Sequence, residues 1–146
     1  MKKTLLLFLC HLFYLFTFAQ GELWTWMHGD TTGNKTGIYG TKGVPAAANK
    51  PGARDGAVSW TDASGNFWLF GGKYPYTFDD KTYYFNDLWK YNPTTNQWTW
   101  VSGDSFTNST GIYGTKGVPA AANKPGARDG AVSWTDASGN FWLFGG

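Results

Sequence analysis

The residues best placed to do chemistry lie in one segment, 73–85, where aromatic rings surround two adjacent carboxylates. The candidate ligand-binding residues are Tyr74, Tyr76, Phe78, Asp79, Asp80, Tyr83 and Tyr84. Exposed rings beside carboxylates suit stacking on a sugar or gripping a peptide, and paired aspartates could ligate calcium. The competing interpretation is that the rings cover the rim of a sheet and the aspartates are solvated. We predict a ligand-binding segment without a metal.

Catalytic chemistry has few candidates in this chain. The only cysteine is Cys10, and the two histidines are His11 and His28. A Ser/His/Asp arrangement would depend on His28, which an internal repeat replaces with Ser102. Asp79 and Asp80 could form a carboxylate pair, but adjacent residues on a loop seldom converge on one substrate atom. We therefore predict no catalytic residue and no cofactor.

The N-terminus has the layout of a secretory signal. Lys2 and Lys3 precede an apolar run over 5–18, and the small residue Ala19 offers a cleavage site. The alternative, a membrane anchor, is disfavoured because this run is shorter than the roughly 20 residues that span a bilayer. Lipid attachment at Cys10 is also disfavoured, since Leu9 precedes it where a small residue is needed. We expect residues 1–19 to be removed and the protein to be secreted or displayed at the cell surface, with the periplasm as the alternative.

Removal of residues 1–19 sets the charge and redox chemistry of the remaining chain. The 12 basic residues fall to ten without Lys2 and Lys3, and they balance ten acidic residues. A neutral chain has no field that would attract nucleic acid or an anionic membrane, so we predict neither as a partner. Because Cys10 is lost as well, the mature chain has no disulfide and must be stabilised by packing.

The chain contains a long internal repeat. Residues 36–72 and 110–146 are identical, and WTWMHGD at 24–30 aligns with WTWVSGD at 98–104. The period is therefore 74 residues (110 minus 36). Repeats of this size bury their apolar faces against the neighbouring copy.

Strand signals follow the repeat, and no helical periodicity follows the N-terminal run. Alternating apolar residues predict strands at 57–61 and 97–101, and compact apolar runs predict strands at 67–70 and 88–91. The segments DASGN (62–66) and NPTTN (92–96) are rich in turn-forming residues. We predict an all-β protein of four-stranded antiparallel units, with an additional outer strand at Leu23 to Met27.

This unit resembles the kelch repeat, the blade of a β-propeller like the central domain of galactose oxidase. The resemblance is carried by FWLFGG (67–72), NDLW (86–89), Arg54, and a tyrosine and a tryptophan, Tyr91 and Trp98, with six residues between them. Two features depart from the family: Gly56-Ala57 replaces a frequent His-Ser pair, and the period of 74 exceeds the roughly 50 of kelch units.

The resemblance implies a domain organisation. The expected parts are a signal peptide (1–19), an outer strand with an inserted loop (20–52), a complete blade (53–101), a second inserted loop (102–126) and the first half of the next blade (127–146). A propeller closes with about 4–8 blades, so we expect a fragment whose ring is completed by missing blades or by other copies of the chain. The tryptophans Trp60, Trp68, Trp98 and Trp100 are then expected to pack between adjacent sheets.

The expected topology also locates a binding face. Up-and-down strands put both tight turns at one end of the sheet and the long connections 28–52, 72–86 and 102–126 at the other. Loops on a rigid scaffold usually carry function. We predict a secreted, non-catalytic module that binds a protein or glycan through the long-loop face. The alternative is a fragment of a secreted enzyme, galactose-oxidase-like or carbohydrate-active, whose catalytic residues lie in missing blades.

Overall fold

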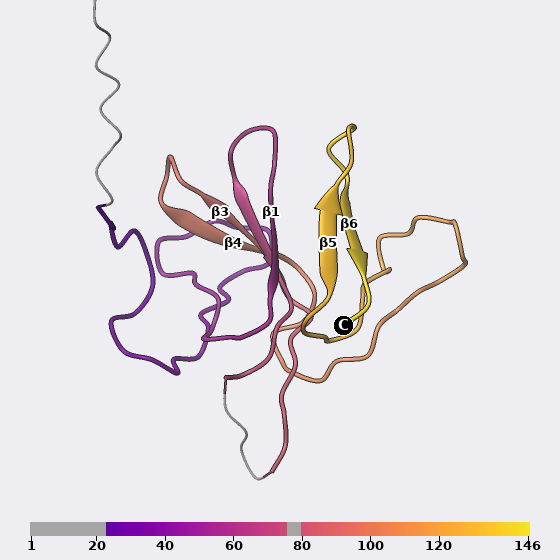
Figure 1. Cartoon of the computed structure of the whole chain (residues 1–146), viewed down its shortest axis with the longest axis horizontal. Coiled ribbons are helices and arrows are strands. Elements are labelled where there is room, and N and C mark those ends of the chain that lie inside the picture. The colour runs from indigo at the N-terminus through magenta and orange to yellow at the C-terminus, as the bar shows by residue number, and fades with distance from the viewer. Residues whose placement is uncertain (1–22, 76–79) are drawn as a thin grey trace, which may run out of the picture.

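The computed structural model describes residues 23–75 and 80–146, and within this part the chain is all-β, as predicted, with no helix. The strands form an antiparallel four-stranded sheet in the order β1-β2-β3-β4 and a two-stranded sheet of β5 and β6 (Figure 1). The six strands are β1 (Val58–Thr61), β2 (Phe67–Phe70), β3 (Leu88–Asn92), β4 (Gln97–Ser102), β5 (Val132–Thr135) and β6 (Phe141–Phe144).

The tight turns form because their side chains hydrogen-bond to their own backbone. Between β1 and β2, Asp62 Oδ1 accepts hydrogen bonds from the amides of Ser64 (3.0 Å) and Asn66 (2.9 Å), and Oδ2 accepts one from Trp68 Nε1 (2.9 Å). Hydrogen bonds from Trp68 and Asn66 lower the pKa of Asp62 to about 2. Each turn therefore fixes the register of the hairpin that it joins.

The pairing register gives the four-stranded sheet two distinct faces. Trp60 lies opposite Trp68, and Phe67 lies opposite Tyr91, which in turn lies opposite Trp98. Because side chains alternate across a strand, these two sets point to opposite sides. We call the first the Trp60 face (Val58, Trp60, Trp68, Phe70) and the second the Phe67 face (Phe67, Leu69, Trp89, Tyr91, Trp98, Trp100).

The two sheets pack front to back. Trp60 stacks on Phe141 of β6 at 5.3 Å between ring centroids, and Trp68 meets the same ring edge-on at 5.4 Å. Phe141 is the repeat equivalent of Phe67, so the Trp60 face of one sheet contacts the Phe67-type face of the next, with β1 beside β5. The prediction that Trp60 and Trp68 pack between sheets is confirmed.

The structure assigns Trp98 and Trp100 a different neighbour. Trp98 packs against Tyr91 on its own sheet at 5.1 Å, and Trp100 meets the ring of Tyr39 edge-on at 5.2 Å. Both lie on the Phe67 face, where the long connection before β1 folds over the sheet. Among the described residues they contact this connection and their own sheet, and no second sheet faces them, so sheet-to-sheet packing stays a prediction for this pair.

A buried ion pair connects the long connections to the sheet. Arg54 donates to both carboxylate oxygens of Asp87, at 2.6 and 2.9 Å, and its side chain is 6% exposed while that of Asp87 is 0% exposed. Tyr39 Oη and Trp89 Nε1 each donate to Asp87 Oδ2 at 2.7 Å. Burial and the adjacent carboxylate raise the pKa of Tyr39 far above its usual value. A buried charge needs such a set of partners, and here they come from three separate segments.

The N-terminal strand expected at residues 23–27 is not formed. This segment has no strand conformation, and Trp24 is 99% exposed. The equivalent residues at 97–101 become a strand because β3 supplies the backbone hydrogen bonds. Among the described residues nothing does the same for residues 23–27.

Two of the three long connections lie at one end of the sheets. Figure 1 shows the turns of all three hairpins on one side, and the connections from β2 to β3 and from β4 to β5 on the other. The connection 103–131 is fixed by Asp104, which accepts from Lys124 Nζ at 2.6 and 2.7 Å, from Ser109 and from Asn86. These hydrogen bonds, that of Lys124 first, lower the pKa of Asp104 to about 2. The arrangement agrees with the predicted long-loop face for the connections 72–86 and 102–126. The connection 28–52 instead folds along β4, where Ala46 forms a β-bridge with Trp98 near the tight turn.

Candidate ligand-binding surface

The predicted binding segment is described in part. Tyr76, Phe78 and Asp79 lie outside the described residues. The remaining four candidates, Tyr74, Asp80, Tyr83 and Tyr84, lie on the connection from β2 to β3, at the long-loop end.

The two sides of this connection pair with each other. The amide of Tyr74 donates to the carbonyl of Tyr83 at 2.9 Å, and Lys73 forms a β-bridge with Tyr84. The ring of Tyr74 packs on Phe85 at 4.9 Å and meets Tyr83 edge-on at 6.5 Å. The rings of Tyr74 and Tyr83 therefore contribute to packing within the connection.

Asp80 is exposed and adopts a left-handed backbone conformation, with φ of 59°. Asp and Asn tolerate this conformation better than most residues, which is consistent with a turn at this position. Within residues 23–75 and 80–146, no group of three or more His, Cys, Asp or Glu side chains could hold a metal ion.

The structure brings together a second set of aromatic residues that the sequence did not predict as a site. A pocket of about 680 Å³ lies between the N-terminal segment and the Phe67 face. We call it the aromatic pocket; its lining includes Trp24, Trp26, Met27, His28, Lys50, Pro51, Phe67, Tyr91 and Trp98. Its lining is largely apolar, with a few polar groups, as is usual for small-ligand sites.

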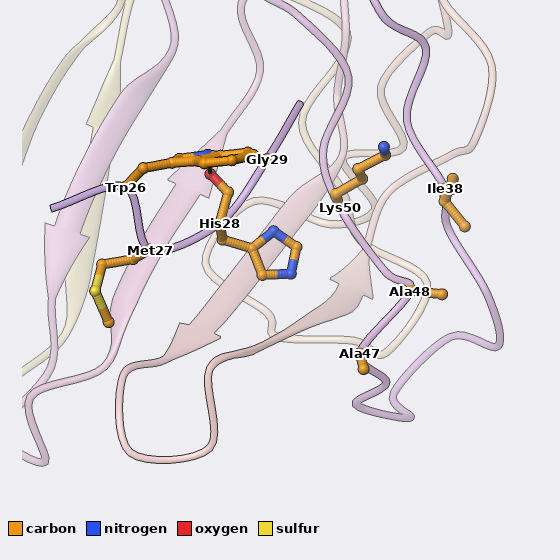
Figure 2. Close-up of a pocket in the computed structure, with 8 residues that line it drawn as sticks. All are labelled: Trp26, Met27, His28, Gly29, Ile38, Ala47, Ala48 and Lys50. Atoms are coloured by element: carbon orange, nitrogen blue, oxygen red, sulfur yellow. Dashed lines mark hydrogen bonds between the residues drawn. The ribbon is translucent and has the colours of Figure 1, made fainter. Parts of the chain in front are cut away.

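A smaller hollow of about 430 Å³ adjoins the aromatic pocket and extends it beneath the long connection before β1. Figure 2 shows Trp26, Met27 and His28 on one wall, and Ile38, Ala47 and Ala48 on the opposite wall, with Lys50 between them. Trp26 Nε1 donates a hydrogen bond to the carbonyl of His28 at 3.0 Å, which fixes the indole against the backbone of the wall formed by residues 26–28. Both hollows therefore include residues of a long connection.

Two polar side chains project into these hollows. His28 Nδ1 is buried without a hydrogen-bond partner among the described residues, and its ring meets that of Tyr91 edge-on at 6.2 Å. Lys50 Nζ donates to both oxygens of Asp30, at 2.6 and 2.7 Å. A buried polar atom without a partner is uncommon in a folded protein and indicates a position that a ligand atom or a water can satisfy.

Sequence reasoning missed this pocket for a specific reason. The motif WTW occurs at 24–26 and at 98–100, and the second copy is a strand, so the first was assigned the same role. One feature of the sequence could have indicated the site: no predicted strand lies close to residues 23–27 along the chain to pair with them. Two tryptophans without a partner strand are free to line a surface.

Comparison of the chain with protein-family models, with curated proteins and with solved structures gave no match. Within the part of the chain that the structure describes, no helix has the length and hydropathy needed to cross a membrane. The geometry of this chain's own residues is therefore the basis on which a function can be proposed.

Proposed function

We propose that the protein is a secreted, non-catalytic binding module that recognises a glycan or a protein through the aromatic pocket, where the long connection before β1 meets strand residues beside the tight turns. We further propose that its sheets are successive blades of a kelch-like β-propeller. The front-to-back packing of Trp60 on Phe141 supports this architecture, because each sheet presents one face to each neighbour. The predicted signal at residues 1–19 supports export.

One observation carries the binding function: the aromatic pocket combines ring surfaces with a small number of polar groups. Its volume of about 680 Å³ falls within the roughly 300–1,000 Å³ of small-ligand sites. Trp24 and Trp26 are exposed while Tyr91 is buried, so exposed rings form the walls of the pocket over a buried aromatic floor. Flat rings bind the apolar faces of sugars, and Lys50, which lines the pocket, can donate hydrogen bonds to hydroxyl groups. These features favour a glycan over a protein ligand.

The experiment is a titration of the chain with neutral oligosaccharides of several linkages, followed by tryptophan fluorescence and calorimetry. We expect at least one oligosaccharide to bind, and Trp26→Ala and Phe67→Ala to weaken that binding tenfold or more. The matched control is Phe106→Ala, because Phe106 is also an exposed ring but lies outside the pocket. Equal binding by all three variants, or no binding by any sugar, would contradict the glycan proposal.

A further inference from the structure

The outer edge of β6 offers a binding site whose ligand can be inferred from the other half of the molecule. β6 pairs with β5 on one side, and among the described residues no strand pairs with its other side. β2 has the same sequence, FWLF, and is paired on both sides, with β1 and with β3. An unpaired edge presents backbone donors and acceptors that an added strand can satisfy.

Arg128 marks the end of this edge. Its Nε donates to the carbonyl of Gly126 at 3.1 Å and its Nη1 to that of Gly145 at 2.7 Å. Arg54 makes the equivalent hydrogen bonds to Gly52 (3.1 Å) and Gly71 (2.9 Å). The two guanidinium groups are therefore held in the same way by the same local sequence.

The two arginines differ in the side chains that their guanidinium groups contact. Arg54 binds the carboxylate of Asp87 through both Nη1 and Nη2, and Tyr39 donates to the same carboxylate. Arg128 Nη2 instead donates to the hydroxyl of Tyr113, the equivalent of Tyr39, at 3.0 Å. Within residues 23–75 and 80–146, no carboxylate pairs with Arg128. A guanidinium and a phenol thus converge where the first copy holds an acid.

We propose that the outer edge of β6, together with Arg128 and Tyr113, binds an extended segment that carries an Asp-Leu-Trp sequence. The template is β3, where Asp87 directly precedes the strand and Leu88 lies opposite Phe70. The bound segment runs antiparallel to β6, with its leucine opposite Phe144, and its tryptophan opposite Leu143. The carboxylate of its aspartate accepts two hydrogen bonds from the guanidinium of Arg128. The backbone carbonyl of the same aspartate accepts a hydrogen bond from the amide of Gly145, as the carbonyl of Asp87 accepts one from the amide of Gly71 at 3.2 Å.

Apolar surface beside this edge agrees with such a ligand. Phe144 is 70% exposed, whereas the identical Phe70 is 5% exposed between its neighbours. The added strand would cover part of this surface while it satisfies the backbone. The site is separate from the aromatic pocket, and its test does not depend on the proposed glycan binding.

The test uses a fluorescent synthetic peptide with the sequence of residues 86–102, which contains both β3 and β4, titrated with the 146-residue chain. We expect saturable binding of one peptide per chain, measured by anisotropy. A peptide in which the residue at position 87 is changed (Asp87→Asn) should bind at least tenfold more weakly, because it loses the paired charge while the protein is unaltered. The chain variant Arg128→Gln should show a similar loss, and the control Lys35→Gln should show none.

Hydrogen exchange of the chain locates the bound peptide. We expect new protection at the amides of residues 141–145 and little change elsewhere. Equal affinity for the Asp and Asn peptides, protection confined to other strands, or no binding at millimolar peptide would each overturn the proposal. Self-association of the chain that protects the β6 edge and excludes the peptide would overturn it too, since the occupant would then be a second copy.

Discussion

The two copies of the repeated segment have the same sequence over 37 residues (36–72 and 110–146), yet their surroundings differ. Local contacts are reproduced: Asp136 organises the β5–β6 turn as Asp62 organises the β1–β2 turn, and Lys124 pairs with Asp104 as Lys50 pairs with Asp30. Burial is not reproduced, since Trp60 is 9% exposed and its equivalent Trp134 is 48% exposed. Sequence thus determines the hairpins and loops, while neighbouring strands and sheets determine which side chains form a core.

The largest expected effect comes from Asp87, the acid that pairs with Arg54 of the first copy. Asp87→Asn should lower the free energy of unfolding by about 3–5 kcal/mol, because Arg54 would remain buried without a compensating charge. Arg128→Gln should cost less than about 1 kcal/mol, because Arg128 has no carboxylate partner among the described residues. Urea denaturation followed by tryptophan fluorescence measures both. Similar costs for the two variants would show that the buried ion pair does not distinguish the copies.

The tryptophan between the sheets provides a second matched pair. Trp60→Ala should cost about 3–5 kcal/mol, because it opens a cavity against Phe141. Trp134→Ala should cost less than about 1 kcal/mol, because half of this side chain is already exposed. The same denaturation series serves as the measurement, with Trp60→Phe as a control that keeps most of the ring contact. The packing account fails if Trp134→Ala is as harmful as Trp60→Ala.

Two equivalent glycines test the contact between the two copies, and their substitution should change the stability by less than the variants above. Gly71 and Gly145 both have positive φ (68° and 77°), so alanine at either position costs about 1–2 kcal/mol of backbone strain. A Cβ at Gly71 would also lie 2.7 Å from the carbonyl oxygen of Arg128, whereas a Cβ at Gly145 would have nothing within 4 Å. Gly71→Ala should therefore be the more destabilising of the two in thermal unfolding. Equal shifts in Tm would mean that the backbone at Arg128 moves away without cost.

The smallest expected difference concerns the turn aspartates. The pKa of Asp62 is lowered to about 2, mainly by Trp68 and then Asn66, and that of Asp136 to about 2, mainly by Asn140 and then Trp142. A carboxyl whose folded pKa lies below its unfolded value of 3.8 stabilises the protein above about pH 4, and this stabilisation is lost as the pH falls toward 2. NMR titration of the carboxyl carbons should give both residues the same low pKa. A difference of a full unit would show that the sheet neighbours, and not the turn alone, set this value.

Much of the fold could be predicted from the sequence because the signals are local. The turn residues at 62–66 and 92–96 and the alternating apolar residues predicted β1 to β4 to within one residue at each end. The prediction of a strand at 23–27 was wrong because a strand needs a partner strand, and the sequence of the segment does not show whether a partner is present.

The candidate site was harder to predict for the same reason. The aromatic pocket combines residues from 24 to 98, and its walls meet only when the long connection folds over the Phe67 face. The Arg54–Asp87 pair joins residues separated by 33 positions, and the sequence indicated each residue only as part of a motif. Of the predicted ligand-binding residues, Tyr76, Phe78 and Asp79 lie outside the described residues, and their role stays a prediction.

The front-to-back contact of Trp60 with Phe141 has a consequence for how such a chain can change length over generations. Each copy carries both halves of that contact: an indole on one face, and a phenylalanine at the equivalent position on the other. An in-frame duplication of one period therefore inserts a unit that already fits the units on either side. No compensating substitution is needed for the new interface, so the number of units can rise or fall by recombination between near-identical segments while the packing chemistry stays constant.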